Sequence, residues 1–318
     1  MIVNLQEKLK EAMVAVLTAW NGAMTSVKTT LAEWVTVIPS TTSANNYHWV
    51  ELLVQIRKKI GPRVIGNLRA QKWTVENEEY EGTYGIRRTD LEDDNLGLLA
   101  PQAQNLYGVA QNHWESLAFQ AELDGFSKAC YDGQFFIDTD HPALTDDGTT
   151  VSNHGTAAFD DQGVALKEAV ETFWSITGPS GEVLDLEPYE VHVGPSNYWK
   201  ALALYEKSSK PGGAGEDNEL KGRYKPRINP KFVGAYAAYW TVLARFRGTN
   251  LGPIVVQQRL QPELATTMIN QSGGNDLGIP SEDYQMFNSG DVLIGSRQRG
   301  AATFTFWALE YGSDGSVA

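Results

Sequence analysis

The chain has 318 residues, of which 42% are hydrophobic and 20% charged, and this composition excludes an intrinsically disordered protein. Its formal net charge of −13 repels phosphate backbones and anionic lipids, which argues against a nucleic-acid-binding protein and a peripheral membrane protein. A single cysteine excludes an internal disulfide, and no apolar run is long enough to span a bilayer. We therefore expect a soluble protein made inside the cell, stabilised by packing alone.

The amino-terminal segment predicts an amphipathic helix over residues 4–20. Apolar residues recur there at helical spacing: Leu5, Leu9, Met13, Leu17 and Trp20. A Thr- and Ser-rich stretch, 39–46, follows and predicts an extended connector. The apolar stripe could pack on its own subunit or reach a neighbouring copy as an arm, and the sequence leaves both open.

Residues 63–88 predict two strands that form a long hairpin with Asn77–Glu79 at its tip. Trp73 and Val75 alternate with polar residues before the tip, and the alternation continues after it. A lone two-stranded hairpin is only marginally stable in water. Another element must therefore cover its apolar faces.

A long helix is predicted over residues 101–128, where the only helix breakers after Pro101 are Gly108 and Gly125. The acidic residues Asp93 and Asp94 lie near its expected start, where negative charge is favourable. At 1.5 Å per residue the rod would be about 42 Å long, which is unusual in a globular domain.

The remaining segments alternate between helix and strand. Residues 143–158 predict a loop, 163–176 a helix, 188–206 a strand followed by a turn and a helix, and 210–222 a surface loop. From about Phe232 onward the chain contains apolar runs typical of strands. No internal repeat is present.

The segment CYDGQFFIDTDHP, residues 130–142, is the first candidate for chemistry. It combines Cys130 with Asp132, and Asp138, Asp140 and His141 could bind a divalent cation. Their spacing is loose, however, and no second carboxylate-rich segment completes a coordination sphere. Asp-Gly and His-Pro are turn dipeptides, and residues 135–137 between them predict a buried strand. A turn-rich joint is the favoured interpretation.

The other catalytic signals are weak. Cys130 has no evident histidine partner, so a buried inert thiol is expected. Ser196 in GPSNY lacks the final glycine of a nucleophile elbow, and helix capping by Ser196 or Asn197 is favoured instead. Residues 145–155 lack calcium-loop spacing, and GGAG at 212–215 lacks the Lys-Ser/Thr of a phosphate loop. We predict no catalytic, cofactor-binding or metal-binding residue.

Four segments together resemble one family, the major head subunit of Mu-like phages and prophages. They are RRTDLEDDNLG (87–97), DGFSKACYDGQFFIDTDHP (124–142), LGPIVVQQR (251–259) and GSRQRGAATFTFWALEYGS (295–313). They follow the order of that family and are spread over most of the chain, whereas residues 143–230 match less distinctly.

The resemblance implies an α+β protein with the HK-97-like capsid fold. Its parts would be an N-terminal arm, an extended E-loop hairpin, a peripheral domain that contains a long spine helix, and an axial domain. The expected divisions are an arm at 1–45, an E-loop at 61–88, a peripheral domain at 46–60, 89–150 and 250–318 with the spine helix at 101–128, and an axial domain at 151–249. In this fold the segment 130–142 would be the exit from the spine helix into the sheet.

The resemblance also implies a function and partners. The chain would be a capsid subunit that assembles with itself into hexamers and pentamers of a virion shell around double-stranded DNA, in the host cytoplasm. Because it begins at Met1, a separate scaffold protein is expected, along with a portal and possible decoration proteins. An encapsulin-like compartment shell, and a hydrolase using Ser196 or residues 138–141, are the alternatives.

Overall fold

The protein is described by a computed structural model at residues 5–48, 73–87, 89, 96–145, 148–209, 217–266 and 291–317. The helices are α1 (Leu5–Ser26), α2 (Leu31–Trp34), α4 (Leu99–Asp124), α5 (Val164–Ser175) and α6 (Tyr198–Glu206), with 3₁₀ turns η2 (Leu96–Leu98), η3 (Gly234–Tyr236) and η4 (Trp307–Leu309). The strands are β1 (Thr36–Pro39), β2 (Ala44–Tyr47), β3 (Trp73–Glu76), β4 (Glu78–Arg87), β5 (His141–Pro142), β6 (Thr150–Val151), β7 (His154–Ala157), β8 (Leu186–Val193), β9 (Lys225–Ile228), β10 (Trp240–Phe246), β11 (Ile254–Thr266), β12 (Asp291–Phe304) and β13 (Glu310–Val317).

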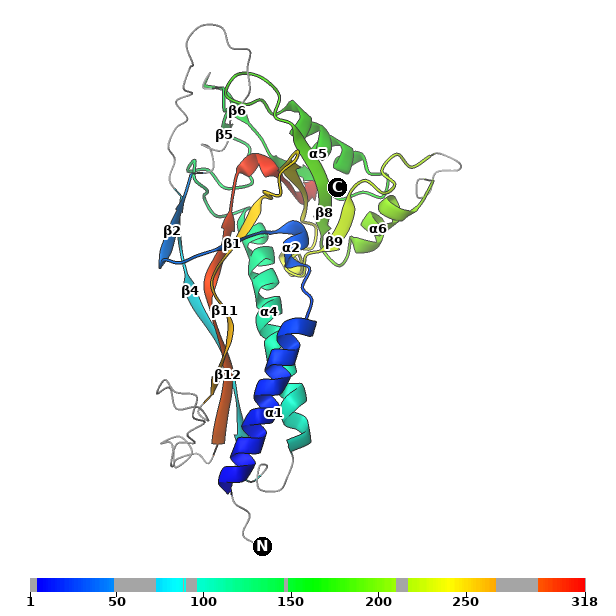
Figure 1. The fold of residues 1–318 in the computed structure, drawn as a ribbon. Helices are drawn as coiled ribbons and strands as arrows, with labels where there is room; N and C mark the ends of the chain where they lie inside the picture. Colours follow the sequence, from blue (N-terminus) through cyan, green and yellow to red (C-terminus); the bar gives the residue numbers. More distant parts are fainter. Residues whose placement is uncertain are drawn as a thin grey trace.

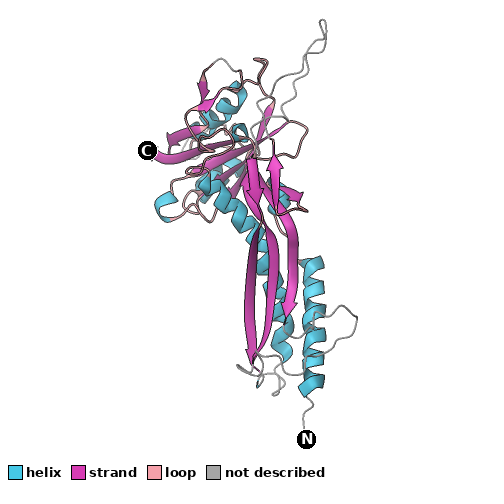
Figure 2. Cartoon of the chain, turned by 90° about the vertical axis from the view of Figure 1, so that its left-hand side faces the viewer, coloured by secondary structure: helices cyan, strands magenta, loops and turns pink. Residues whose placement is uncertain are grey.

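The body is elongated, with a wedge of sheet and helices at one end (Figure 1). Helix α4 runs along the body, with α1 beside it and the long strands of a four-stranded sheet, order β1-β11-β12-β4, on its other side (Figures 1 and 2). The wedge contains a five-stranded sheet in the order β7-β13-β10-β8-β9. The α+β class and the long helix predicted from the sequence are confirmed.

Helix α1 packs on α4 of its own chain. Met13 and Val16 of α1 share a buried cluster with Ala103 of α4 and Ile294 of β12, and Trp20 meets Tyr107 edge-on at 5.0 Å between ring centroids. The sequence left open whether the apolar stripe packs on its own subunit or on a neighbouring copy. In this structure the stripe packs on its own subunit.

The sheet beside α4 has one apolar and one charged face. Ile86 and Ile294 point into the cluster with the helices. On the opposite face Glu81 lies across from Arg297 in the strand register, and Arg297 donates a hydrogen bond to Glu79. The helices therefore provide the cover that a half-apolar ribbon needs.

The predicted hairpin tip at Asn77–Glu79 is wrong. Strand β3 pairs antiparallel with β2, and β4 pairs antiparallel with β12, so the chain passes from one sheet to another at Asn77. Buried Asn77 donates to the Ser40 hydroxyl at 3.0 Å and accepts from Gln257 Nε2 at 2.6 Å. Residues 63–72 of the predicted hairpin, and Asp93 and Asp94, lie outside the described residues.

The other differences are local. Helix α4 ends at Asp124, four residues earlier than predicted, and turns occupy 125–128. The predicted loop at 143–158 contains β6 and β7. Residues 135–137 are not a strand: Phe136 and Ile137 are buried, whereas Phe135 is exposed.

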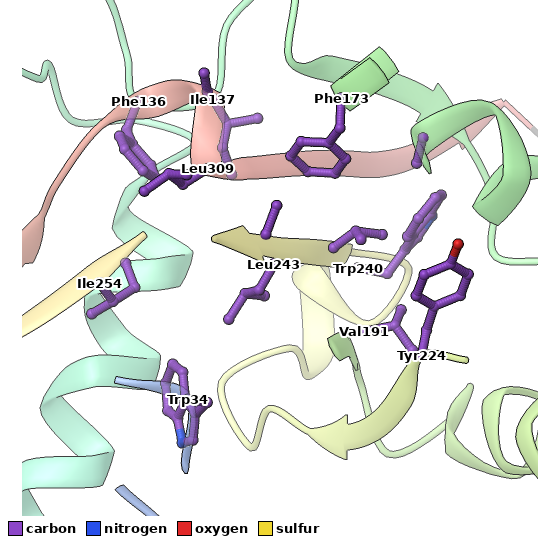
Figure 3. Close-up of a cluster of buried hydrophobic side chains, with 14 of the residues drawn as sticks. Trp34, Phe136, Ile137, Phe173, Val191, Tyr224, Trp240, Leu243, Ile254 and Leu309 are labelled. Atoms are coloured by element: carbon purple, nitrogen blue, oxygen red, sulfur yellow. The ribbon is translucent and has the colours of Figure 1, made fainter. Parts of the chain in front are cut away.

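The main core lies between the two sheets and the carboxyl end of α4. Figure 3 shows Trp240 and Leu243 of β10 among side chains from other elements, including Trp34, Phe173 and Leu309. Val191 and Val193 of β8 belong to the core, as do residues of α5 and α6. The alternate β8 residues Glu190 and His192 point to the opposite face, toward α4.

The elongated shape leaves much surface uncovered. The whole chain exposes 17427 Å², whereas a compact monomer of its mass is expected to expose about 13,000 Å².

The packing of α4 on the sheet predicts a strong effect of Gly300→Ala. A Cβ there would meet the Gln257 carbonyl oxygen and lie 2.8 Å from the Trp114 ring, so β12 would have to move away from both. We expect a loss of about 1–3 kcal/mol in the free energy of unfolding, measured by chemical denaturation. Gly82→Ala on the neighbouring strand is the control, because only Leu106, at 3.9 Å, is near its Cβ. Equal losses in both variants would contradict this packing.

Candidate functional site

Cys130, Asp132 and His141 form a polar cluster just beyond the end of α4. The Cys130 thiol donates to Asp132 Oδ1 at 3.0 Å, and His141 Nδ1 lies 2.7 Å from Asp132 Oδ2. The backbone amide of Gln134 also donates to Asp132 Oδ1, at 3.1 Å. Cys130 and His141 are buried, and the imidazole stacks on the Trp307 ring with centroids 4.4 Å apart.

The three side chains offer metal-ligating atoms within 4.8 Å of one another, but their geometry fits hydrogen bonds better. Contacts with His141 and Cys130 outweigh the effect of burial and lower the pKa of Asp132, so its carboxylate can only accept. The His141 proton then sits on Nδ1. A metal at Nδ1 would move that proton to the buried Nε2, which has no acceptor among the described residues.

The cluster is also unsuited to nucleophilic catalysis. Burial, with the adjacent Asp132 carboxylate, raises the pKa of the Cys130 thiol, so the reactive thiolate is disfavoured. Asp132 stands between the thiol and the imidazole and bonds to both, so His141 is not placed to take the thiol proton. The arrangement can lock the turn after α4, and it supports the expectation of an inert thiol.

The residues predicted as a possible cation site do not come together. The Asp138 carboxylate accepts from the backbone amides of Phe135 and Thr139, at 3.1 and 2.7 Å, and Asp140 is exposed. His141 pairs with Asp132 instead. Sequence reasoning missed this pairing, although Gly133, at φ 93°, marks the tight turn that folds Asp132 back.

The predicted cap of α6 is wrong. The Asn197 side chain makes no capping bond, and the Ser196 hydroxyl donates to the Ala237 carbonyl at 3.1 Å. In the segment 145–155, positions 146–147 lie outside the described residues, as do all of 212–215.

A second polar cluster surrounds Glu122, which faces the five-stranded sheet from the last turn of α4. Its fully buried carboxylate lies 2.8 Å from His192 Nδ1, accepts from Asn229 Nδ2 at 2.9 Å, and accepts from the Thr241 hydroxyl. Sequence reasoning missed it, although Glu122 continues the apolar stripe of Trp114 and Ala118 at i+4 spacing. A charged residue on an otherwise apolar stripe was the signal in the sequence that could have indicated this cluster.

The buried acidic residues and His192 influence one another's protonation, which limits the net charge of this cluster. Burial alone would lower the pKa of His192, but Glu122 and Glu190 outweigh it and raise the pKa to about 9. Burial and the nearby Glu122 raise the pKa of Glu310 well above its ordinary value. At neutral pH an imidazolium therefore faces Glu122, and the raised pKa favours the uncharged form of Glu310.

Ion pairs extend this cluster to the amino-terminal segment. Arg227 Nε donates to Glu190 at 2.5 Å, and Arg227 Nη2 donates to Glu33 of α2 at 3.0 Å. The Arg227 guanidinium also lies 5.9 Å from the centroid of Trp34. The cluster therefore joins α4, the wedge and α2.

The helices offer nothing that could cross a membrane: in the described part of the chain, none is both long and apolar enough.

The cluster at Asp132 predicts a structural effect without metal dependence. Asp132→Asn replaces a charged double acceptor by a neutral amide, and we expect the free energy of unfolding to fall by about 1–3 kcal/mol. Asp140→Asn, at an exposed position, should be close to neutral. Thermal unfolding of the wild type should not shift on adding EDTA or zinc. A lower midpoint in EDTA would mean that the cluster holds a metal.

The Glu122 cluster predicts pH dependence. His192 binds its proton more tightly in the folded chain, with a pKa of about 9, than in the unfolded chain, where the pKa is about 6.5. Stability from this proton is complete below the unfolded value and is lost as pH rises toward the folded value, by up to about 3 kcal/mol. His192→Gln should be less stable at pH 7 and lose less stability from pH 7 to 9.5, measured by urea unfolding. An unchanged pH slope in the variant would refute this role.

The first part of the chain is similar in sequence to known phage and prophage proteins. Residues 9–163 match the model of the family described as Mu-like prophage major head subunit gpT. Over 138 residues the chain is 36% identical to the Mu-like prophage FluMu major head subunit of Haemophilus influenzae, covering 43% of this chain and 45% of that protein. It is 35% identical over 140 residues to the major capsid protein of Escherichia phage Mu, covering 42% and 46%. The match thus spans less than half of either relative.

Solved structures extend the likeness to the whole chain. The chain resembles a subunit of the procapsid of bacteriophage JBD30 with a TM-score of 0.58 and 25% identity, over 98% of this chain and 76% of that one. It resembles a subunit of the capsid of an empty GTA particle with a TM-score of 0.53 and 10% identity, over 90% of each. Residues 9–163 are thus similar to the Mu-like prophage major head subunits, and the chain has the HK-97-like capsid fold.

Proposed function

We propose that the chain is the major capsid subunit of a tailed-phage head, assembling with itself into hexamers and pentamers of an icosahedral shell around double-stranded DNA. The observation that carries the proposal is the likeness of 98% of the chain to a subunit of a phage procapsid, at 25% identity. The match of residues 9–163 to the Mu-like head subunits supports it independently.

The shape of the chain supports assembly on physical grounds. It exposes roughly 4,000 Å² more than a compact protein of its mass. Its exposed apolar side chains include Val14 and Met24 on α1 and Val109 on α4. Burying such surface on neighbours at roughly 25 cal/mol per Å² stabilises a shell through many weak contacts.

The expected divisions of the fold are part of the proposal. They are an arm at 1–45, an E-loop at 61–88, a peripheral domain at 46–60, 89–150 and 250–318, and an axial domain at 151–249. Of the described elements, α4, β11 and β12 fall in the peripheral part and the wedge falls mostly in the axial part, whereas β1 of the same four-stranded sheet falls in the arm and β4 in the E-loop. The spine helix is α4.

We further propose that the shell protein has no catalytic, metal-binding or cofactor-binding role. The closed hydrogen bonding of Asp132 and the raised pKa of Cys130 support this. Its partners would be a separate scaffold, a portal and possible decoration proteins, met during assembly in the host cytoplasm. A formal charge of −13 suits a container that confines DNA by closure and not by specific binding.

The test is recombinant expression followed by size-exclusion chromatography and negative-stain microscopy. Ring-shaped capsomers or particles tens of nanometres across are expected, and packaged nucleic acid would distinguish a phage head from a compartment with protein cargo. Assembly should increase from low to moderate salt, or with divalent cations, because screening weakens repulsion between acidic subunits. A clean monomer under all conditions, or a yield that falls with salt, contradicts the proposal.

A further inference from the structure

The wedge carries the helices α5 and α6 (Figure 1), and each of them presents an exposed surface, of opposite charge to the other. The α5 surface consists of Val164, Glu168, Glu171 and Trp174, and the α6 surface consists of Trp199, Lys207, Lys221 and Arg223. Both helices lie on the face of the five-stranded sheet that carries Val191 and Val193, opposite to α4. Within one chain, neither outer surface is covered by a described element.

The α5 surface combines apolar exposure with unpaired negative charge. Val164 is 57% exposed and Trp174 is 54% exposed. Glu168 and Glu171 are exposed at i,i+3 spacing, where like charges destabilise a helix, and neither forms an ion pair with another described residue. The isolated subunit gives no account of this cost.

The α6 surface mirrors this arrangement with positive charge. Trp199 is 73% exposed. The turn around residue 222 packs at the carboxyl end of α6, where the Gly222 amide donates to the Tyr205 carbonyl at 2.9 Å and Lys221 Nζ donates to Ser208 Oγ at 2.7 Å. Lys207 and Arg223, both exposed there, form no ion pair with any residue in the described ranges.

The separation of charge extends along the sequence. Residues 158–190 contain 8 acidic residues and 1 basic residue, whereas 196–231 contain 8 basic and 4 acidic residues. A net positive segment is unexpected in a chain with a formal charge of −13. Complementary surfaces of this kind determine partner choice and register when proteins associate.

We propose that the α5 surface of one copy docks on the α6 surface of a second copy. The carboxylates of Glu168 and Glu171 then meet the cations of Lys207 and Arg223, and the exposed tryptophans become buried anchors, the usual role of tryptophan at interfaces. Because the two surfaces differ, the contact is head-to-tail and can close into a ring. This inference rests on the proposed shell function and assigns one of its contacts. Nucleic acid would match the α6 surface alone and leave the α5 surface unexplained.

Charge reversal tests the contact on the full chain. Glu168→Lys with Glu171→Lys, or Lys207→Glu with Arg223→Glu, should each lower the assembled fraction at least tenfold, measured by size exclusion and microscopy. All four changes in one chain should restore assembly to within about twofold of the wild type, because each surface again meets its opposite. Trp199→Ala should reduce assembly without lowering the thermal midpoint, since the residue is 73% exposed.

The controls separate the possible failures. Asp140→Lys with Glu76→Lys makes the same change in net charge as the α5 reversal, at exposed positions after α4 and on β3, and should leave assembly intact. If the wild type does not assemble, the proposed function fails. If it assembles and either reversal leaves assembly unchanged, or the fourfold variant is no better than its parents, only the docking contact fails. An α6 reversal that assembles normally but loses bound DNA would assign that surface to nucleic acid and overturn the proposal.

Mixing the two reversed chains tests the head-to-tail geometry. Each chain alone presents two like surfaces, so contacts form only between unlike chains and the ring must alternate. Rings with an even number of members are therefore expected, with few or no pentamers and hence few closed shells. Closed shells at wild-type yield from this mixture would contradict a head-to-tail contact.

Discussion

The buried carboxylate of Glu122 constrains where the long helix meets the wedge. A charge removed from water is costly unless it is paired and hydrogen-bonded, and here its partners come from β8, β10 and the segment after β9. The helix cannot slide or rotate on the sheet without leaving that charge unsatisfied. Apolar packing alone would tolerate a small shift, so the polar contacts specify the position that the core merely stabilises.

The other end of α4 is held differently. At that end α1 covers the helix with an apolar stripe, and in mid-helix Trp114, eight residues before Glu122, lies against Gly300 of β12, so shape and not charge sets the register. A rod fixed to a sheet at one end and to a wedge at the other is rigid but elongated. Its large surface relative to volume follows directly. In the proposed function, an assembly of many copies would supply the burial that such a chain lacks alone.

Periodicity in the sequence was sufficient to locate α1, α4 and α5, because each presents an apolar stripe over several turns. It was not sufficient to pair strands. The alternation at Trp73 and Val75 correctly indicated a strand, but it contains no information on which neighbour that strand joins. Asn77 decides this through bonds to Ser40 and Gln257, residues distant in the sequence. The partners of a buried amide cannot be read from local pattern.

The polar clusters show the same limit in a sharper form. Nearness along the chain grouped Asp138 and Asp140 with His141, whereas the fold selects Asp132, because the turn at Gly133 folds it back toward the ring. Likewise the total charge of −13 suggested uniform repulsion between copies. The sign of local surfaces matters more at contact range, since screening removes distant charges and leaves neighbouring ones. An acidic chain can therefore associate through a minority of lysines and arginines, provided that the fold gathers them in one place, as at the carboxyl end of α6.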